Sequence, residues 1–208
     1  MNFFLSPKCL KIFFLNELNQ RGNTICGQGA TDLCFGLSNS KNLKTLALKF
    51  TGKNQISDDG VYGMCSGLVQ FENLQKLTLD LRDNQISVYG VQDLGYGLGN
   101  CQNLEILTLN LASNYNQKFS NRIGNSGVQG LILGLSNIPK LKTLKLDLSQ
   151  NEINRIDKDF ITGLQNCIRL TNLELQLKLN QINVHDKKRL LTKTKTMTRL
   201  VKYNIKYA

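Results

Sequence analysis

Leucine alternates with polar residues in several short stretches of the chain. Leu77, Leu79 and Leu81 are separated by Thr78 and Asp80, and this period of two is expected of a strand with one buried face. The same alternation of leucine with other residues occurs at 144–148 and at 173–177. We therefore predict a β-strand in each of these stretches.

A different period follows each predicted strand. After Ile86, the stripe of Gly90, Val91, Leu94 and Leu98 has spacings of three and four residues, which indicates a short amphipathic helix. Corresponding stripes occur at 25–37, 56–68 and 123–135. Each unit is thus predicted to run strand, loop, helix, loop. Strands joined by helical crossovers must be parallel.

The strand–helix unit recurs along the chain. Aligning the copies on their first leucine places their starts at Leu43, Leu74, Leu104, Leu141, Leu170 and Leu200, with spacings of 31, 30, 37, 29 and 30 residues. A period of this size is typical of a solenoid, in which stacked units bury a core that no single unit could bury alone. A further helical stripe at 25–37 shows that the array begins before Leu43.

The repeated pattern L-x-x-L-x-L-x-L-x-x-N-x-I-x-x-x-G-V-x-x-L-x-x-x-L resembles the leucine-rich repeat, nearest its ribonuclease-inhibitor-like subclass. It departs from that subclass by about two residues in an extended strand segment. The resemblance covers 23–208, whereas 1–22 fit the pattern poorly and are expected to form an N-terminal cap or a degenerate repeat. It implies an α/β fold: a right-handed solenoid with a parallel sheet on the concave face and helices on the convex face.

Asparagine recurs where the chain leaves each predicted strand. The positions are Asn54, Asn84, Asn114, Asn151 and Asn180. A buried turn leaves backbone groups unpaired there, and an amide side chain can bond them as donor and acceptor. We predict that these asparagines belong to the scaffold.

The sequence departs from the repeat in three places. The insertion YNQKFSN, residues 115–121, is predicted to bulge out as a loop, either as a tolerated expansion or as a contact for a partner. Asp157 and Asp186 replace the repeat's glycine, which predicts weakened helices near the end of the array. The segment LVKYNIKYA is predicted to be an edge strand, with Tyr203 and Tyr207 in the core and with lysines between core positions that discourage aggregation.

The charge is concentrated at the C-terminal end. The chain carries a net charge of +11, and residues 186–208 hold eight Lys and Arg residues against one acidic residue. Such a stretch suits nucleic acid, acidic lipid or an acidic protein surface, or else it is a solvated end that aids solubility. The candidate anion-binding residues are Lys187, Lys188, Arg189, Lys193 and Lys195.

The residues with chemical potential do not form a recognisable catalytic pattern. The chain has six cysteines but no C-x-x-C pair, so we expect buried free thiols, no metal site and a reducing compartment. His185 is the single histidine, and no motif joins it to a nucleophile. Phosphate-loop and protein-kinase motifs are absent from the sequence. We predict a non-enzymatic protein without a cofactor.

The leading functional hypothesis is a protein-binding scaffold or a subunit of a larger assembly. It would bind through the concave sheet face and the inserted loop. The candidate binding residues are Lys76, Thr78, Asp80, Thr108, Asn110, Lys145, Asp147, Glu174 and Gln176. Their polar, mixed-charge character suits an extended protein contact better than a deep ligand pocket.

Two alternatives remain at this stage. The first is an RNA- or ribonucleoprotein-associated subunit that contacts phosphate through the basic C-terminal stretch. The second is a GTPase regulator, a role known among leucine-rich-repeat proteins, although no residue of this chain matches one. The N-terminal apolar stretch is too short and too interrupted to span a membrane. The sequence has no N-x-S/T sequon, and we predict a cytoplasmic location, with the nucleus as the alternative.

Overall fold

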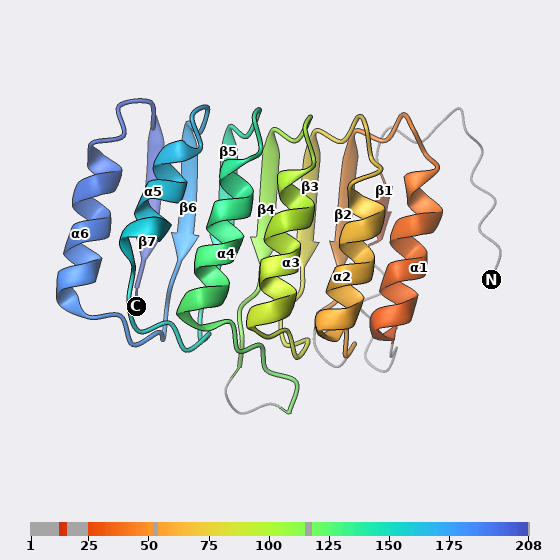
Figure 1. Ribbon diagram of the computed structural model, residues 1–208, viewed down its shortest axis with the longest axis horizontal. Coiled ribbons are helices and arrows are strands. Elements are labelled where there is room, and N and C mark those ends of the chain that lie inside the picture. Colours follow the sequence, from red (N-terminus) through yellow and green to blue (C-terminus); the bar gives the residue numbers. More distant parts are fainter. Residues whose placement is uncertain (1–12, 16–24, 52–53, 115–117, 208) are drawn as a thin grey trace.

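The computed structural model describes residues 13–15, 25–51, 54–114 and 118–207. Strands and helices alternate throughout these residues (Figure 1). The strands are β1 (Phe13–Leu15), β2 (Thr45–Lys49), β3 (Lys76–Asp80), β4 (Ile106–Asn110), β5 (Thr143–Asp147), β6 (Asn172–Gln176) and β7 (Lys202–Lys206). The helices are α1 (Cys26–Ser38), α2 (Ser57–Leu68), α3 (Val88–Gly99), α4 (Gly124–Ser136), α5 (Lys158–Asn166) and α6 (Val184–Lys195).

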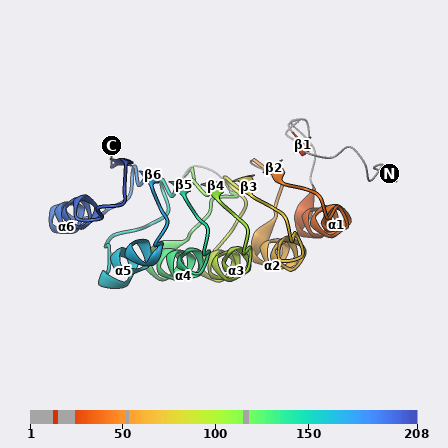
Figure 2. The ribbon, with the colours of Figure 1, turned by 90° about the horizontal axis from the view of Figure 1, so that it is seen from above.

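The strands form a single parallel sheet whose spatial order follows the sequence, from β1 to β7. Each described crossover between neighbouring strands contains one helix. Figure 2 shows that the helices lie in one layer on one side of the sheet. The other side, called here the open face, carries none of the described helices. The predicted α/β repeat with a parallel sheet is therefore confirmed.

The register of the sheet brings equivalent residues of successive repeats side by side. Leu77 pairs with Leu46 on one side and with Leu107 on the other, and all three are fully buried. The residues between the leucines point to the open face because side chains alternate along a strand. Lys145 of β5 pairs in this way with Thr108 of β4 and Glu174 of β6. The predicted alternation of buried and outward positions is confirmed for β3 to β6.

Asparagines link the turns that follow the strands, but one of the predicted positions is wrong. Asn54, Asn84, Asn151 and Asn180 are buried, whereas Asn114 is exposed and Asn121 takes its place with 1% exposure. The side-chain oxygen of Asn180 accepts from the backbone N–H groups of Asn151 and Ile153 in the preceding unit, at 2.9 and 3.1 Å. The asparagines therefore join neighbouring repeats, and the inserted residues precede Asn121.

The backbone explains why a side chain must supply these hydrogen bonds. Asp83 and Gln85, on either side of Asn84, both adopt left-handed conformations, with φ of 53° and 60°. Gln150 and Glu152 do the same around Asn151, with φ of 57° and 60°. Such a turn cannot satisfy its own N–H and C=O groups in a regular pattern, so the buried amide bonds them instead.

Glycines allow close packing of the first four helices. A Cβ atom on Gly134 of α4 would overlap the backbone carbonyl group of Gly95 in α3. One on Gly60 of α2 would overlap the Cα atom of Gly27 in α1. Both positions are far inside van der Waals contact. The glycines of the repeat therefore set how near neighbouring helices approach.

The last unit is joined to the array by polar contacts. Asp186 is buried, and its carboxylate accepts from the backbone N–H of Ile156 at 3.1 Å. Arg199 donates from Nε to the carbonyl oxygen of Cys167 at 3.1 Å, and its Nη2 donates to those of Leu164 and Gln165. Arg199 thus caps the C-terminal end of α5, where carbonyl groups lack helical partners.

Two predictions for this end of the array need correction. Helix α5 is short, with 9 residues, as predicted, but α6 has 12, as many as α2 and α3. Asp186 does not weaken α6, because its carboxylate bonds the preceding unit. Tyr203 is not a core residue: it is 37% exposed, since β7 is the last strand of the sheet and no described unit covers it. Tyr207 is half-buried, and burial raises its pKa to about 12.

The predicted N-terminal cap, residues 1–22, lies mostly outside the described residues. Within it, β1 adds a strand to the sheet beside β2. Cys9 also lies outside the described residues.

Candidate protein-binding surface

The nine predicted binding residues lie on the four strands β3 to β6. Those of β3 and β4 are Lys76, Thr78, Asp80, Thr108 and Asn110, and those of β5 and β6 are Lys145, Asp147, Glu174 and Gln176. Lys76 and Lys145 are exposed, while the other seven are half-buried. The sheet register therefore brings these residues together on the open face, as the period of two predicted.

An ion pair crosses the open face. Lys145 Nζ of β5 lies 3.3 Å from Glu174 Oε2 of β6, and the two residues are direct partners in the sheet register. The side chains are 54% and 32% exposed, so water screens their attraction and the pair contributes little to stability. Its effect is to fix a positive group beside a negative one on the face.

Three of the nine residues also shape the turns at the ends of their strands. Asp80, Asn110 and Asp147 each accept, through a side-chain oxygen, from the backbone N–H two residues further on, at 3.0 to 3.3 Å. Asp80 also holds Arg82 through two hydrogen bonds of 3.0 and 2.9 Å. This contact raises the pKa of Arg82 above its ordinary value. These three residues therefore serve the fold as well as the surface.

The five candidate anion-binding residues lie on α6 but do not share one face. Arg189 donates to the carbonyl oxygen of Ile156 and lies 3.0 Å from Asp186, so its guanidinium binds within the protein. Lys187 lies over the ring of Tyr207, 5.3 Å from its centroid. Lys188, Lys193 and Lys195 are exposed. At 100° per residue, Lys188 and Lys195 point outward together, and Lys193 points to another side.

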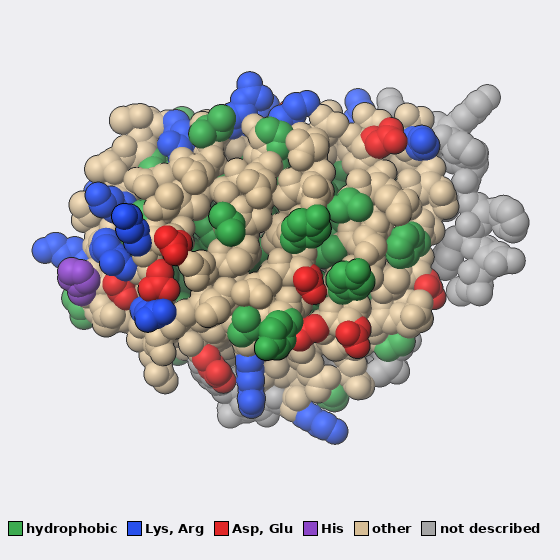
Figure 3. All heavy atoms as spheres, viewed as in Figure 1, with side chains coloured by type: hydrophobic (Ala, Val, Ile, Leu, Met, Phe, Trp, Pro, Cys, Tyr) green, Lys and Arg blue, Asp and Glu red, His purple; other side chains and the backbone are tan. Residues whose placement is uncertain are grey.

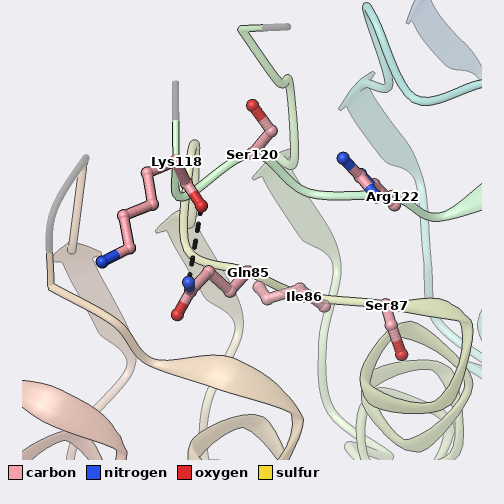
Figure 4. Close-up of a pocket in the computed structure, with 6 residues that line it drawn as sticks. All are labelled: Gln85, Ile86, Ser87, Lys118, Ser120 and Arg122. Carbon is pink, nitrogen blue, oxygen red and sulfur yellow. Dashed lines mark hydrogen bonds between the residues drawn. The ribbon is translucent and has the colours of Figure 1, made fainter. Parts of the chain in front are cut away.

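A pocket of about 330 Å³ lies beside the inserted segment. It is lined by Gln85, Ile86, Ser87, Lys118, Ser120 and Arg122. Figure 4 shows that Lys118 and Arg122 extend in different directions rather than toward a common point. Arg122 also lies 3.7 Å from Glu152, and Ser87 donates to Asp58 at 2.5 Å. The polar groups do not converge on a small ligand.

The described thiols behave as small buried side chains, with one exception. Cys34, Cys65, Cys101 and Cys167 are buried, as predicted, whereas Cys26 is exposed. Burial raises the pKa of Cys34 to about 12, and those of Cys101 and Cys167 to about 11. The pKa of Cys65 is raised as well, chiefly by burial. Thiols with such pKa values are poor nucleophiles at neutral pH. Among the described residues, no group of His, Cys, Asp and Glu is placed to hold a metal ion.

The side of the molecule covered by helices carries exposed aromatic residues that were not among the predicted binding residues. Tyr62, Tyr89 and Tyr96 are 64%, 75% and 77% exposed on α2 and α3, and Phe35 of α1 is 40% exposed. The repeat pattern is defined by positions that recur as leucine or glycine, so it does not mark these outward residues. The signal was present as D-x-x-F or D-x-x-Y in 32–35, 59–62 and 93–96.

A shallow groove adjoins these aromatic residues. It lies between α3 and α4, has a volume of about 470 Å³, and is flanked by Tyr96 and Leu133. Gly99, Gly130 and Gly134 also line it. Leu133 is 63% exposed, so the groove presents an apolar rim to solvent.

Across the described residues, the helices are too short or too polar to cross a membrane. No protein-family model matches the chain, and a search of curated proteins found no match.

Proposed function

We propose that this chain is a leucine-rich-repeat protein that binds another protein and catalyses no reaction. In this proposal the array is a right-handed solenoid whose open face is its concave side. The bound protein would lie across β3 to β6 and reach the inserted loop. A cytoplasmic, reducing location accords with the buried thiols.

The observation that carries the proposal is the open face itself. Its outward residues are polar, they stand in register over several strands, and none of the described helices covers them. A fixed array of donors, acceptors and opposite charges favours an extended, complementary partner surface. The pocket beside the inserted segment lacks converging polar groups, which makes a small ligand a weaker candidate.

The RNA-binding alternative depends on α6, and the contacts there favour it less. Arg189 and Arg199 bond backbone carbonyl groups of the preceding unit, and Lys187 packs over Tyr207. The exposed lysines that remain are Lys188, Lys193 and Lys195 on α6 and Lys202 and Lys206 on β7, and those of α6 do not share one face. Phosphate binding draws its affinity from many neutralised charges on one surface, so this divided set gives a small footprint.

A charge swap on the open face tests the proposal without removing an ion pair. In the double variant Lys145→Glu/Glu174→Lys the two side chains can still pair, but the pattern of charge presented to a partner is reversed. The matched control is Lys188→Gln/Lys195→Gln on α6, which leaves Arg189 and its contacts in place. Tagged proteins would be purified from the native cell, and their bound proteins identified by mass spectrometry.

We expect the swap to remove the specific partners and the control to retain them. Thermal melting of both variants should resemble that of the unmodified protein. The alternative would be supported instead by two results together. The swap variant would keep every partner, and nucleic acid would co-purify in a salt-sensitive way with the unmodified protein but not with the control variant.

A further inference from the structure

The charge of the helices is divided sharply along the array. Helices α1 to α4 contain four aspartates and neither lysine nor arginine. Helix α6 contains five basic residues and one aspartate. Figure 3 shows green and red side chains over α1, α2 and α3, and blue ones gathered toward α6 with a few red ones beside them. A chain with a net charge of +11 therefore carries a locally acidic surface.

Aspartate and aromatic residues are paired on this surface. Asp32 precedes Phe35, Asp59 precedes Tyr62, and Asp93 precedes Tyr96, each by three residues. Residues three apart lie on the same side of a helix. No ion pair between described residues involves these three aspartates. We call these six residues, together with Tyr89, the helix-side surface.

We propose that the helix-side surface is a docking site for a lysine- and arginine-rich helix of a partner protein. Cations bind over the faces of tyrosine rings, and the neighbouring aspartates attract the same cations. The apolar stems of lysine and arginine, or apolar residues beside them, can enter the groove between Tyr96 and Leu133. The site is distinct from the open face, because the helices separate the two.

The positive charge of the rest of the molecule does not prevent this contact. Packed helices are about 10 Å apart, so α6 lies on the order of 40 Å from α2 along the array. The Debye length at physiological ionic strength is about 8 Å. A bound cationic helix therefore interacts mainly with the nearby aspartates.

A synthetic helical peptide provides the probe. It carries lysine and arginine on one face and leucine on the other, and its partner peptide has glutamate in place of the basic residues. Binding of each labelled peptide to the full chain would be measured by fluorescence anisotropy at low and high salt. We expect the basic peptide to bind and the acidic peptide not to bind. The affinity should fall with salt because the attraction is partly between exposed charges.

Two variants separate the contributions of rings and charges. Tyr62→Ser/Tyr89→Ser/Tyr96→Ser should weaken binding by about tenfold or more, whereas the matching changes to phenylalanine should alter it by about twofold or less. Asp32→Asn/Asp59→Asn/Asp93→Asn should also weaken it and reduce its salt dependence. Val184→Ser/Val201→Ser removes apolar residues that are 81% and 85% exposed at the other end of the array, and should have no effect. The swap at Lys145 and Glu174 should also leave binding unchanged.

Three results would overturn the proposal. One is equal binding of the acidic peptide, and another is unchanged binding by both the serine and the asparagine variants. The third is salt-sensitive self-association of the unmodified chain, measured by sedimentation, that the asparagine variant abolishes. In that case the occupant would be the basic α6 of a second copy.

Discussion

The side-chain oxygen of Asn121 accepts a hydrogen bond from the backbone N–H of Asn84 at 3.0 Å, and a second from Ile86 at 2.9 Å. Its amide nitrogen donates to the carbonyl oxygens of Leu81 and Leu111 at 3.0 and 3.1 Å. One side chain thus satisfies four backbone groups in two neighbouring units. The inserted segment leaves this link intact because its extra residues lie upstream of Asn121.

Replacing Asn121 should therefore be costly. Asn121→Ala removes the partners of three backbone groups in a buried turn, while the Leu111 carbonyl keeps its hydrogen bond from Asn151. Each unsatisfied buried group costs about 1–3 kcal/mol before water or relaxation compensates. We expect a loss of about 3 kcal/mol or more in the free energy of unfolding. Asn114→Ala, at an exposed position seven residues upstream, should change it by less than about 1 kcal/mol. Urea unfolding of both variants measures the difference, and equal losses would contradict the assignment of Asn121.

The misplacement of this asparagine shows what the repeat pattern can specify. Buried leucines were placed correctly in β3 to β6, because a shift of one residue would move every one of them to the open face. Asn114 fits the strand side of the repeat, three residues after Leu111, whereas Asn121 fits its helix side, two residues before Ile123. An alignment can therefore place the gap after Asn114 or before Asn121. The choice depends on which residue reaches the unpaired groups of Asn84 and Ile86, and this is a three-dimensional condition.

The surroundings of two glycines predict that replacement by alanine changes the free energy of unfolding in opposite directions. A Cβ at Gly134 would meet the backbone of Gly95, which cannot rotate away, so α3 and α4 would have to separate. Gly134→Ala should lower the free energy of unfolding by about 1–3 kcal/mol. Gly36 of α1 is exposed, and a Cβ there would meet no atom within 4 Å, so Gly36→Ala should raise it by about 0.5–1 kcal/mol through helix propensity. Denaturant unfolding of the two variants measures both effects. If both changes destabilised the protein, close packing of α3 and α4 would not explain the loss at Gly134.

The buried thiols predict a loss of stability in alkaline solution. The pKa values of Cys101 and Cys167 rise from an ordinary 9.0 to about 11 in the folded protein. Their contribution is therefore complete below about pH 9 and is lost as the pH rises toward 11, because the unfolded chain ionises first. At pH 10 the loss is about 1–2 kcal/mol for each thiol.

Comparison with a variant isolates this effect from other groups that titrate in the same range. Cys101→Ala/Cys167→Ala leaves cavities whose cost is the same at both pH values, so it cancels in the difference. The fall in unfolding free energy from pH 7 to pH 10 should be about 3 kcal/mol smaller in the variant than in the unmodified protein. Urea titrations at the two pH values provide the measurement. Identical falls would mean that the thiols ionise at ordinary pH values in the folded state.

The sequence predicted the candidate surfaces unevenly, and the reason is physical. Residues such as Lys145 and Glu174 could be placed together from the sequence. The strand period determines the face of the sheet to which each side chain points, and the repeat spacing determines which residue lies beside it on the next strand. Tyr62 and Tyr96 were missed because exposed helix positions tolerate many residue types and leave no periodic signal. Arg189 was assigned by its charge alone, and its contact with Ile156 depends on how α6 packs against the preceding turn.

Arg199 provides the last prediction, because it belongs to the basic stretch and yet has a structural role. Its guanidinium spans three carbonyl groups around the end of α5, and hydrogen bonds from a charged donor contribute about 1.5–3 kcal/mol. Arg199→Met retains the apolar stem and removes the donors, so it should lower the free energy of unfolding by about 1–3 kcal/mol. It should also speed hydrogen exchange of amides in α5 and α6. Lys193→Met, at an exposed site of the same charge, should stay within about 0.5 kcal/mol of the unmodified protein. A Lys193→Met loss as large as that of Arg199→Met would show that net charge, rather than the α5 cap, sets the stability of this end.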